Sequence, residues 1–315
     1  MFSFEALRGK AVLAPMAGVG DSAFRAVCAR SGAACTVSEM VSAKAIHYGD
    51  TSTDALMYIS ADERPCGVQL FGSEPDIIAE AVRHAERFEP DFIDINMGCP
   101  VPKVTGNGDG SALLREPALA GRVMDAAVRA ASVPVSVKLR TGWDSEHIVA
   151  PEYVRMAREC GVSAVAVHGR TRQGGYSAPI DFDTIAKCAG VGGIFVFGNG
   201  GLNSAADCAE MFGRTGCDAV MVARGALGNP LIFREIAGGA PASVPERLAL
   251  FLEQTRLAVG QKGEFVALRQ ARKHAGFYLR GMRGSADLRR RGGAVETLAQ
   301  LEQIVAEALS AEGAF

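Results

Sequence analysis

The sequence predicts an α/β protein whose larger part is a (β/α)8 TIM barrel, followed by a small C-terminal all-helical domain. Short apolar runs recur eight times in about the first 230 residues, and amphipathic or alanine-rich segments lie between most of them. After residue 245 no strand-like run occurs. Strand–helix alternation repeated eight times is what a (β/α)8 barrel requires. A doubly wound parallel sheet is the alternative that this alternation leaves open.

The expected strands are short, rich in β-branched residues, and followed by glycine, proline or polar residues, which end strands. The segments between them have the spacing or alanine content of helices. The strands are predicted at Ala11–Pro15, Cys35–Met40, Cys66–Phe71, Phe92–Met97, Val133–Arg140, Ala164–His168, Ile194–Gly198 and Ala219–Ala223. The helices are predicted at about 20–31, 75–88, 116–132, 150–160, 181–190 and 203–214, with a less regular stretch at 41–62.

The chain divides near residue 238, where the pattern changes. Residues 238–245 are rich in Gly and Pro and indicate a linker. Residues 246–315 have apolar positions at helical spacing, which fits a small bundle. We therefore expect a catalytic barrel at 1–237 and a helical domain at 246–315.

Charge is distributed unevenly between these two parts. The whole chain has a net charge of −2, but residues 243–315 carry 11 Lys and Arg against 8 Asp and Glu. Between Arg256 and Arg291, ten basic residues face two acidic ones, a net +8 in 36 residues. Such a segment favours a polyanionic partner such as RNA. A basic helical tail that binds nothing is the alternative.

Composition and cysteine spacing narrow the class of protein further. Hydrophobic residues make up 48% and charged residues 22%, and no apolar run is long enough to span a bilayer. The start of the chain lacks the pattern of a signal peptide. The 8 cysteines are scattered, without a CxxC pair, which favours reduced thiols and no metal centre. We expect a cytoplasmic monomer without a membrane partner.

The ends of the predicted strands carry polar and glycine-rich residues, and in a barrel the chemistry lies at these carboxyl ends. The loops after the seventh and eighth strands contain Asn199-Gly200-Gly201 and Ala223-Arg224. Loops at these two positions commonly bind a phosphate through backbone N–H groups, and an arginine adds a bidentate partner. On glycine content alone, tight turns are an equally good interpretation.

A ring of hydrogen-bonding side chains ends four other strands: Gln69, Asn96, Lys138 and His168. No carboxylate cluster for a metal accompanies them. This pattern fits flavin mononucleotide (FMN), with amides at the polar edge of the ring and Lys138 beside the charge of the reduced ring. Individually, Lys138 can be a solvated lysine and His168 a core histidine.

Cys99 follows the fourth predicted strand, where Gly98 and Pro100 break regular structure. Most cysteines are core residues. In a barrel, however, a cysteine at this strand end lies where the chemistry of the fold is carried out, so a functional thiol is the alternative.

Several motifs together resemble the tRNA-dihydrouridine synthase family, in particular its bacterial B group. The resemblance covers about residues 8–235, with a weaker continuation at Arg272-Lys273-His274. The motifs are Ala14-Pro15-Met16-Ala17-Gly18, Val68-Gln69-Leu70-Phe71-Gly72, Asn96-Met97-Gly98-Cys99-Pro100 with Lys103 and Gly110-Ser111-Ala112-Leu113-Leu114, Val137-Lys138-Leu139-Arg140-Thr141-Gly142-Trp143, Val167-His168-Gly169-Arg170-Thr171-Arg172, Gly198-Asn199-Gly200, and Arg224-Gly225-Ala226-Leu227-Gly228-Asn229-Pro230.

The resemblance implies that NADPH reduces FMN, that hydride then adds to the 5,6 double bond of a uridine in tRNA, and that Cys99 is the proton donor. Family members usually have glycine where this chain has Ala223, whose methyl group crowds the phosphate turn while leaving its backbone N–H available. The residues implied to contact FMN are Pro15, Met16, Ala17, Gln69, Lys138, His168, Asn199, Gly200, Gly201, Ala223 and Arg224.

A uridine inside folded tRNA has to be extruded to reach such a pocket, which needs basic residues that bind the backbone. For this role we expect Arg140, Arg170 and Arg172, and in the helical domain Arg272 and Lys273. The first three can alternatively pair with nearby carboxylates. Two other functions remain open: a flavin reductase of a free pyrimidine, similar to dihydroorotate dehydrogenase, and an RNA-binding protein that has lost the reaction.

Overall fold

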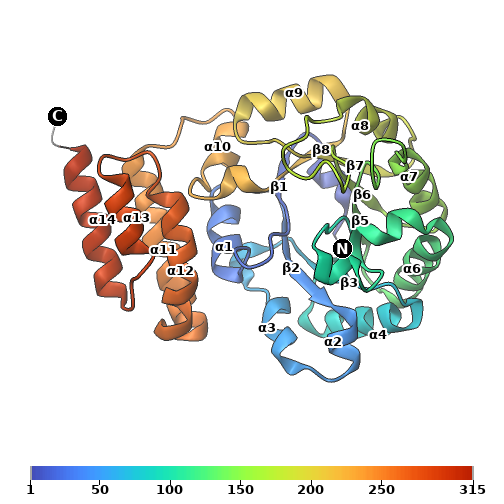
Figure 1. Cartoon of the computed structure of the whole chain (residues 1–315), viewed down its shortest axis with the longest axis horizontal. Helices are drawn as coiled ribbons and strands as arrows, with labels where there is room; N and C mark the ends of the chain where they lie inside the picture. The colour runs from blue at the N-terminus through green and yellow to red at the C-terminus, as the bar shows by residue number, and fades with distance from the viewer. Residues whose placement is uncertain (1, 314–315) are drawn as a thin grey trace.

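The protein is a parallel eight-stranded barrel surrounded by helices, with a group of further helices at one side (Figure 1). The computed structural model describes residues 2–313. The strands follow the order β1-β8-β7-β6-β5-β4-β3-β2. Backbone hydrogen bonds from Ala34 to Ala11 and from Leu13 to Cys35, both 2.9 Å, close the barrel between β1 and β2. The predicted (β/α)8 barrel is thus confirmed, and the doubly wound sheet is wrong.

The eight strands agree with the predicted runs to within two residues at either end. Most of their residues are buried, since helices cover the outside and side chains fill the inside. They are β1 (Ala11–Leu13), β2 (Thr36–Ser42), β3 (Cys66–Phe71), β4 (Phe92–Met97), β5 (Val135–Arg140), β6 (Ala164–His168), β7 (Phe195–Asn199) and β8 (Ala219–Val222).

Each predicted helix of the barrel is present, and the stretch predicted as less regular at 41–62 contains the end of β2 followed by short helices. The barrel helices are α1 (Ser22–Arg30), α2 (Ala43–His47), α3 (Asp54–Met57), α4 (Pro75–Ala85), α5 (Pro102–Thr105), α6 (Pro117–Ala130), α7 (Ala150–Glu159), α8 (Phe182–Ala189), α9 (Ala205–Thr215) and α10 (Ile232–Ile236). Short 3-10 helices are η1 (Phe4–Leu7), η2 (Thr51–Thr53), η3 (Ala61–Glu63), η4 (Glu86–Phe88), η5 (Gly110–Arg115) and η6 (Arg224–Ala226).

Aromatic rings fill the amino-terminal end of the barrel. Phe4 of η1 contacts Phe92, the first residue of β4, with ring centroids 5.0 Å apart, and also contacts Phe195 and Phe197 of β7. These side chains are at most 4% exposed. Because this end is plugged, the open mouth lies at the carboxyl ends of the strands.

Four helices follow the barrel, and the first of them packs against α1 (Figure 1). They are α11 (Val244–Lys262), α12 (Glu264–Tyr278), α13 (Ser285–Gly292) and α14 (Leu298–Glu312). Ser243 and Thr297 form capping boxes that begin α11 and α14. The four helices share an apolar core that includes Ala23 of α1. The predicted helical domain extended to residue 315, and its last two residues lie outside the described part.

Carboxylates neutralise part of the basic segment between Arg256 and Arg291. Arg256 pairs with Glu302 of α14 at 2.6 Å, and Arg291 pairs with Glu307 of the same helix at 2.5 Å. The net positive charge of this surface is therefore smaller than the sequence segment alone indicates.

Candidate active site

A cavity of about 410 Å³ opens at the carboxyl ends of the barrel strands. That volume is within the usual range for small-molecule sites. Its wall contains most of the residues predicted from the sequence: Pro15, Met16, Ala17, Gln69, Asn96, Cys99, Lys138, Arg140, His168, Arg170, Asn199, Gly200, Gly201, Ala223 and Arg224. Arg172, Arg272 and Lys273 were also predicted for the site and do not line the cavity.

The cavity is strongly cationic. Lys138, Arg140, Arg170 and Arg224 line it, and none of the lining residues is Asp or Glu. Burial and the repulsion of these cations lower the pKa of His168 to about 2, so its imidazole is neutral. Unpaired positive charge in a concave site favours an anionic ligand.

Lys138 is one of these cations, and hydrogen bonds hold it in place. Its Nζ donates a hydrogen bond of 3.0 Å to Asn199 Oδ1, while Asn199 Nδ2 donates to the carbonyl of Met221 at 2.6 Å. Burial, with a further contribution from Arg140, lowers the pKa of Lys138 to about 8, and Asp94 opposes that change. Lys138 is therefore an ammonium group that can lose its proton near physiological pH.

Gly200 and Gly201 form a tight turn beside His168 that lines the cavity. Their φ angles are +117° and +71°, a region that side chains rarely adopt. A Cβ on Gly200 would lie 2.8 Å from His168 Cδ2. Arg224 lines the cavity together with this turn, and a guanidinium is a donor suited to a phosphate group. The residues present thus fit a planar cofactor that carries a phosphate.

Cys99 lies half-buried on the opposite wall, in the loop after β4. Asn96 Oδ1 accepts hydrogen bonds from the backbone N–H groups of Gly98 at 3.1 Å and Cys99 at 2.9 Å. The Cys99 carbonyl accepts from Ser111 N–H at 3.0 Å. Burial raises the pKa of the Cys99 thiol. The loop therefore presents a protonated thiol in a fixed position.

A buried chain of hydrogen bonds lies beneath the cavity and ends at Asn96. Asp94 accepts from Ser136 Oγ and from Gln69 Nε2, both at 2.6 Å, and Gln69 Oε1 accepts from Asn96 Nδ2 at 2.9 Å. The sequence-based interpretation missed Asp94 and Ser136. The signal was available for Asp94, because it precedes Asn96 by two positions in β4 and so points to the same inner face.

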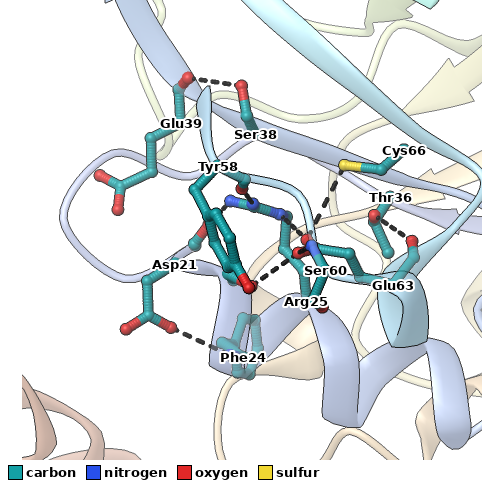
Figure 2. A network of polar contacts seen from close by, with 12 residues as sticks. Asp21, Phe24, Arg25, Thr36, Ser38, Glu39, Tyr58, Ser60, Glu63 and Cys66 are labelled. Carbon is teal, nitrogen blue, oxygen red and sulfur yellow. Dashed lines mark hydrogen bonds and ion pairs between the residues drawn. The ribbon is translucent and has the colours of Figure 1, made fainter. Parts of the chain in front are cut away.

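The loop between β1 and α1 lines the cavity through Pro15, Met16, Ala17 and Val19. Figure 2 shows the polar network beside it. Glu39 accepts from the N–H of Gly18. Arg25 donates to the carbonyls of Gly20 at 2.8 Å and Tyr58 at 2.7 Å, and it forms a fully buried ion pair with Glu63. This network fixes the loop from the barrel side.

The C-terminal helices hold the same loop from the other side. Lys262 of α11 donates to Asp21 Oδ2 and to Gln270 Oε1, both at 2.5 Å. Lys273 of α12 reaches the carbonyl of Gly18 at 3.4 Å. Buried His274 packs against Phe24 of α1. The loop between β1 and α1 therefore lines the cavity and is also held by the C-terminal helices.

Arginines form the outer rim. Arg140 is 2% exposed and donates to the carbonyls of Gly98 at 2.8 Å and Thr171 at 3.0 Å. The ring of Tyr176 lies near Arg140 and Arg224, with 4.3 Å between its centroid and Arg224 Cζ. Tyr176 is an exposed loop residue that no sequence pattern indicated. Within residues 2–313, Arg140, Arg170 and Arg172 form no ion pair with a carboxylate.

The described residues contain no group of three or more His, Cys, Asp or Glu side chains arranged to hold a metal ion. All 8 cysteines are free. No helix among residues 2–313 is long and apolar enough to cross a membrane.

Comparison with known proteins places the chain in a family. The profile of the dihydrouridine synthase (Dus) family matches residues 12–312. The tRNA-dihydrouridine synthase B of Xanthomonas campestris pv. campestris is 40% identical over 89% of this chain and 86% of its own length. The protein of the same name from Pseudomonas aeruginosa is 38% identical over 90% and 87%. A solved structure of morphinone reductase, at 14% identity, shares the fold with a TM-score of 0.55 over 74% of this chain and 87% of its own. This chain is a member of the dihydrouridine synthase family.

Proposed function

We propose that the protein is a tRNA-dihydrouridine synthase, which reduces the 5,6 double bond of a specific uridine in tRNA to dihydrouridine with FMN as bound cofactor and NADPH as electron donor. The observation that carries the proposal is the half-buried thiol of Cys99 facing a cationic cavity at the barrel mouth, in a chain of this family.

The residues that would hold FMN are those of the cavity wall. Gly200, Gly201, Ala223 and Arg224 would bind its phosphate, and the loop Pro15–Ala17 would contact the ring with Gln69, Asn96, His168 and Asn199. Bound FMN, reduced by NADPH, supplies a hydride to the uracil ring. Lys138, with its pKa near 8, would stabilise negative charge beside it.

Cys99 would donate the proton to the second carbon of the double bond. Its raised pKa keeps the thiol protonated until the substrate accepts the proton. The charge of Arg140 opposes that rise and so stabilises the thiolate left after the transfer. Asn96 would orient the Cys99 loop through the two N–H groups that it accepts.

The tRNA would lie across the rim of the barrel and the C-terminal helices. Arg140, Arg170 and Arg172 would bind near the extruded nucleotide, and Arg272 and Lys273 would contact the backbone farther out. The division of labour proposed here is a catalytic barrel at 1–237, a linker at 238–245 and a tRNA-binding helical domain at 246–315. Separate apolar cores in the barrel and the helices support it.

Purified protein reconstituted with FMN tests this function directly. We expect NADPH-dependent formation of dihydrouridine in an unmodified tRNA transcript, and no reduction of free uracil or oxidation of dihydroorotate. Mapping dihydrouridine in tRNA from a strain that lacks the gene should show its loss at a defined position. An unchanged dihydrouridine content, together with turnover of a free pyrimidine, would refute the proposal.

A further inference from the structure

The only tryptophan of the chain lies between two loops of the barrel mouth and contacts two arginines. Trp143 follows β5, Arg115 ends η5, and Arg172 lies in the loop after β6. The guanidinium carbons of Arg115 and Arg172 are 5.0 and 4.7 Å from the centre of the Trp143 ring. These distances are those of cation–π contacts. We call these three residues the arginine–tryptophan platform.

The backbone of the platform is fixed without any ligand. Arg172 N–H donates to the carbonyl of Gly142, and Gln173 N–H donates to that of Trp143, both at 2.9 Å. A Cβ on Gly142 would lie 1.9 Å from the carbonyl oxygen of His147, so only glycine permits this turn. The loops after β5 and β6 therefore hold Trp143 and Arg172 in one backbone arrangement, which lowers the entropic cost of binding a ligand.

The guanidinium groups of the platform are not neutralised. Within the described residues, neither Arg115 nor Arg172 forms an ion pair, and the buried Nε of Arg172 has no hydrogen-bond partner. Two acids are adjacent to the platform in the sequence: Glu116 forms no ion pair among the described residues, and Asp144 accepts hydrogen bonds from His147 and from the N–H of Glu146. Burial lowers the pKa of Arg140, and the charges of Arg170 and Arg172 lower it further, so like charges gather at this rim. An anion bound here would relieve that repulsion.

The platform is connected to the loop that carries Cys99, where the extruded nucleotide would react. Arg140 connects the Cys99 loop to the loop that carries Arg172, because it donates to the carbonyl of Gly98 beside Cys99 and to that of Thr171 beside Arg172. Arg115 belongs to η5, whose Ser111 is hydrogen-bonded to Cys99. The platform is thus joined to the thiol loop, outside the cavity that would hold the cofactor.

We infer that the arginine–tryptophan platform binds a phosphodiester of the RNA strand next to the nucleotide that enters the cavity. This inference rests on the proposed function and assigns binding roles to Arg115 and Trp143. A planar guanidinium forms a bidentate contact with a phosphate, and the indole keeps its plane in place. The site reads no base, so it anchors the strand irrespective of sequence.

Arg115→Met tests the inference, since Arg115 is exposed and its loss leaves the buried contacts intact. Binding of an unmodified tRNA transcript to the holoenzyme is measured as a function of salt. Removing one phosphate contact should lower the slope of log affinity against log salt by about 1 and weaken binding roughly three- to sixfold at physiological salt. Arg172→Met should act in the same way. In the wild type, tRNA should change the fluorescence of Trp143, the single tryptophan.

Arg129→Met is the matched control, because Arg129 is an exposed arginine on α6 already paired with Asp125. It should leave affinity and salt slope unchanged. If wild-type and Arg115→Met proteins bind tRNA with equal slopes and Trp143 emission stays constant, the platform inference is wrong while the proposed function stands. If the wild type binds no tRNA, the proposed function fails. If Arg115→Met raises only the KM for NADPH, the platform binds the phosphate of the dinucleotide, and the RNA assignment is overturned.

Discussion

Replacing Asp94 with asparagine should shift the pH at which the flavin site loses activity. Asp94 is 1% exposed; burial raises its pKa, while hydrogen bonds from Ser136 and Gln69 to its two carboxylate oxygens and the charge of Lys138 oppose that rise and stabilise the ionised form. An asparagine side chain could keep both contacts, because its oxygen can accept from Gln69 and its amide can donate to Ser136. The Asp94→Asn substitution therefore removes a buried negative charge with little loss of packing.

The size of the expected shift in pH follows from the pKa of Lys138. Its pKa is about 8, and Asp94 raises it against burial and Arg140. An opposite charge nearby typically changes a pKa by about 1 to 3 units, and we take the lower end because burial dominates here. A pKa about one unit lower would reduce the protonated fraction of Lys138 at pH 8 from about half to about one tenth.

The assay is the rate of flavin reduction by NADPH as a function of pH. Protonated Lys138 favours the reduced ring, so the rate should fall as pH rises through the pKa of this lysine. In Asp94→Asn that fall should begin about one pH unit lower than in the wild type. Ser136→Ala is the control, because it removes a hydrogen bond to Asp94 and keeps the charge. Coincident profiles for Asp94→Asn and the wild type would refute the electrostatic reasoning.

Three further predictions concern other parts of the structure. Cys99→Ala should bind FMN and tRNA normally but slow oxidation of the reduced flavin by tRNA by about 10²–10⁴; stopped-flow absorbance checks this, and a normal rate would exclude the thiol as the acid. Lys262→Met should weaken FMN binding severalfold, because it frees Asp21 and the cavity loop, whereas Lys262→Arg should restore it; flavin fluorescence titration measures both, and equal affinities would show that the helices do not position the loop. Arg25→Met should lower the free energy of unfolding by about 3–5 kcal/mol, since it leaves Glu63 buried without its partner; urea denaturation measures this, and a loss below about 1 kcal/mol would contradict the importance of the pair.

The sequence by itself determined the barrel and most of its cavity. Strand and helix periods are local properties, so the eight strands were located within two residues at either end. Chemistry lies at strand ends in this fold, so the sequence alone predicts that residues such as Lys138, His168 and Cys99 share one cavity, and they do. Family motifs then indicated what that cavity binds.

Only the tertiary structure decided how these groups are supported. Three sets of contacts join residues that are far apart in sequence. They are the hydrogen bonds from Asp94 through Gln69 to Asn96, the ion pair of Lys262 with Asp21, and the contact of Arg115 with Trp143. No local pattern reports such contacts, because they depend on how strands, loops and helices meet in space. For the same reason, the pairing of Arg256 and Arg291 with carboxylates of α14 could not be read from the charge of their own segment.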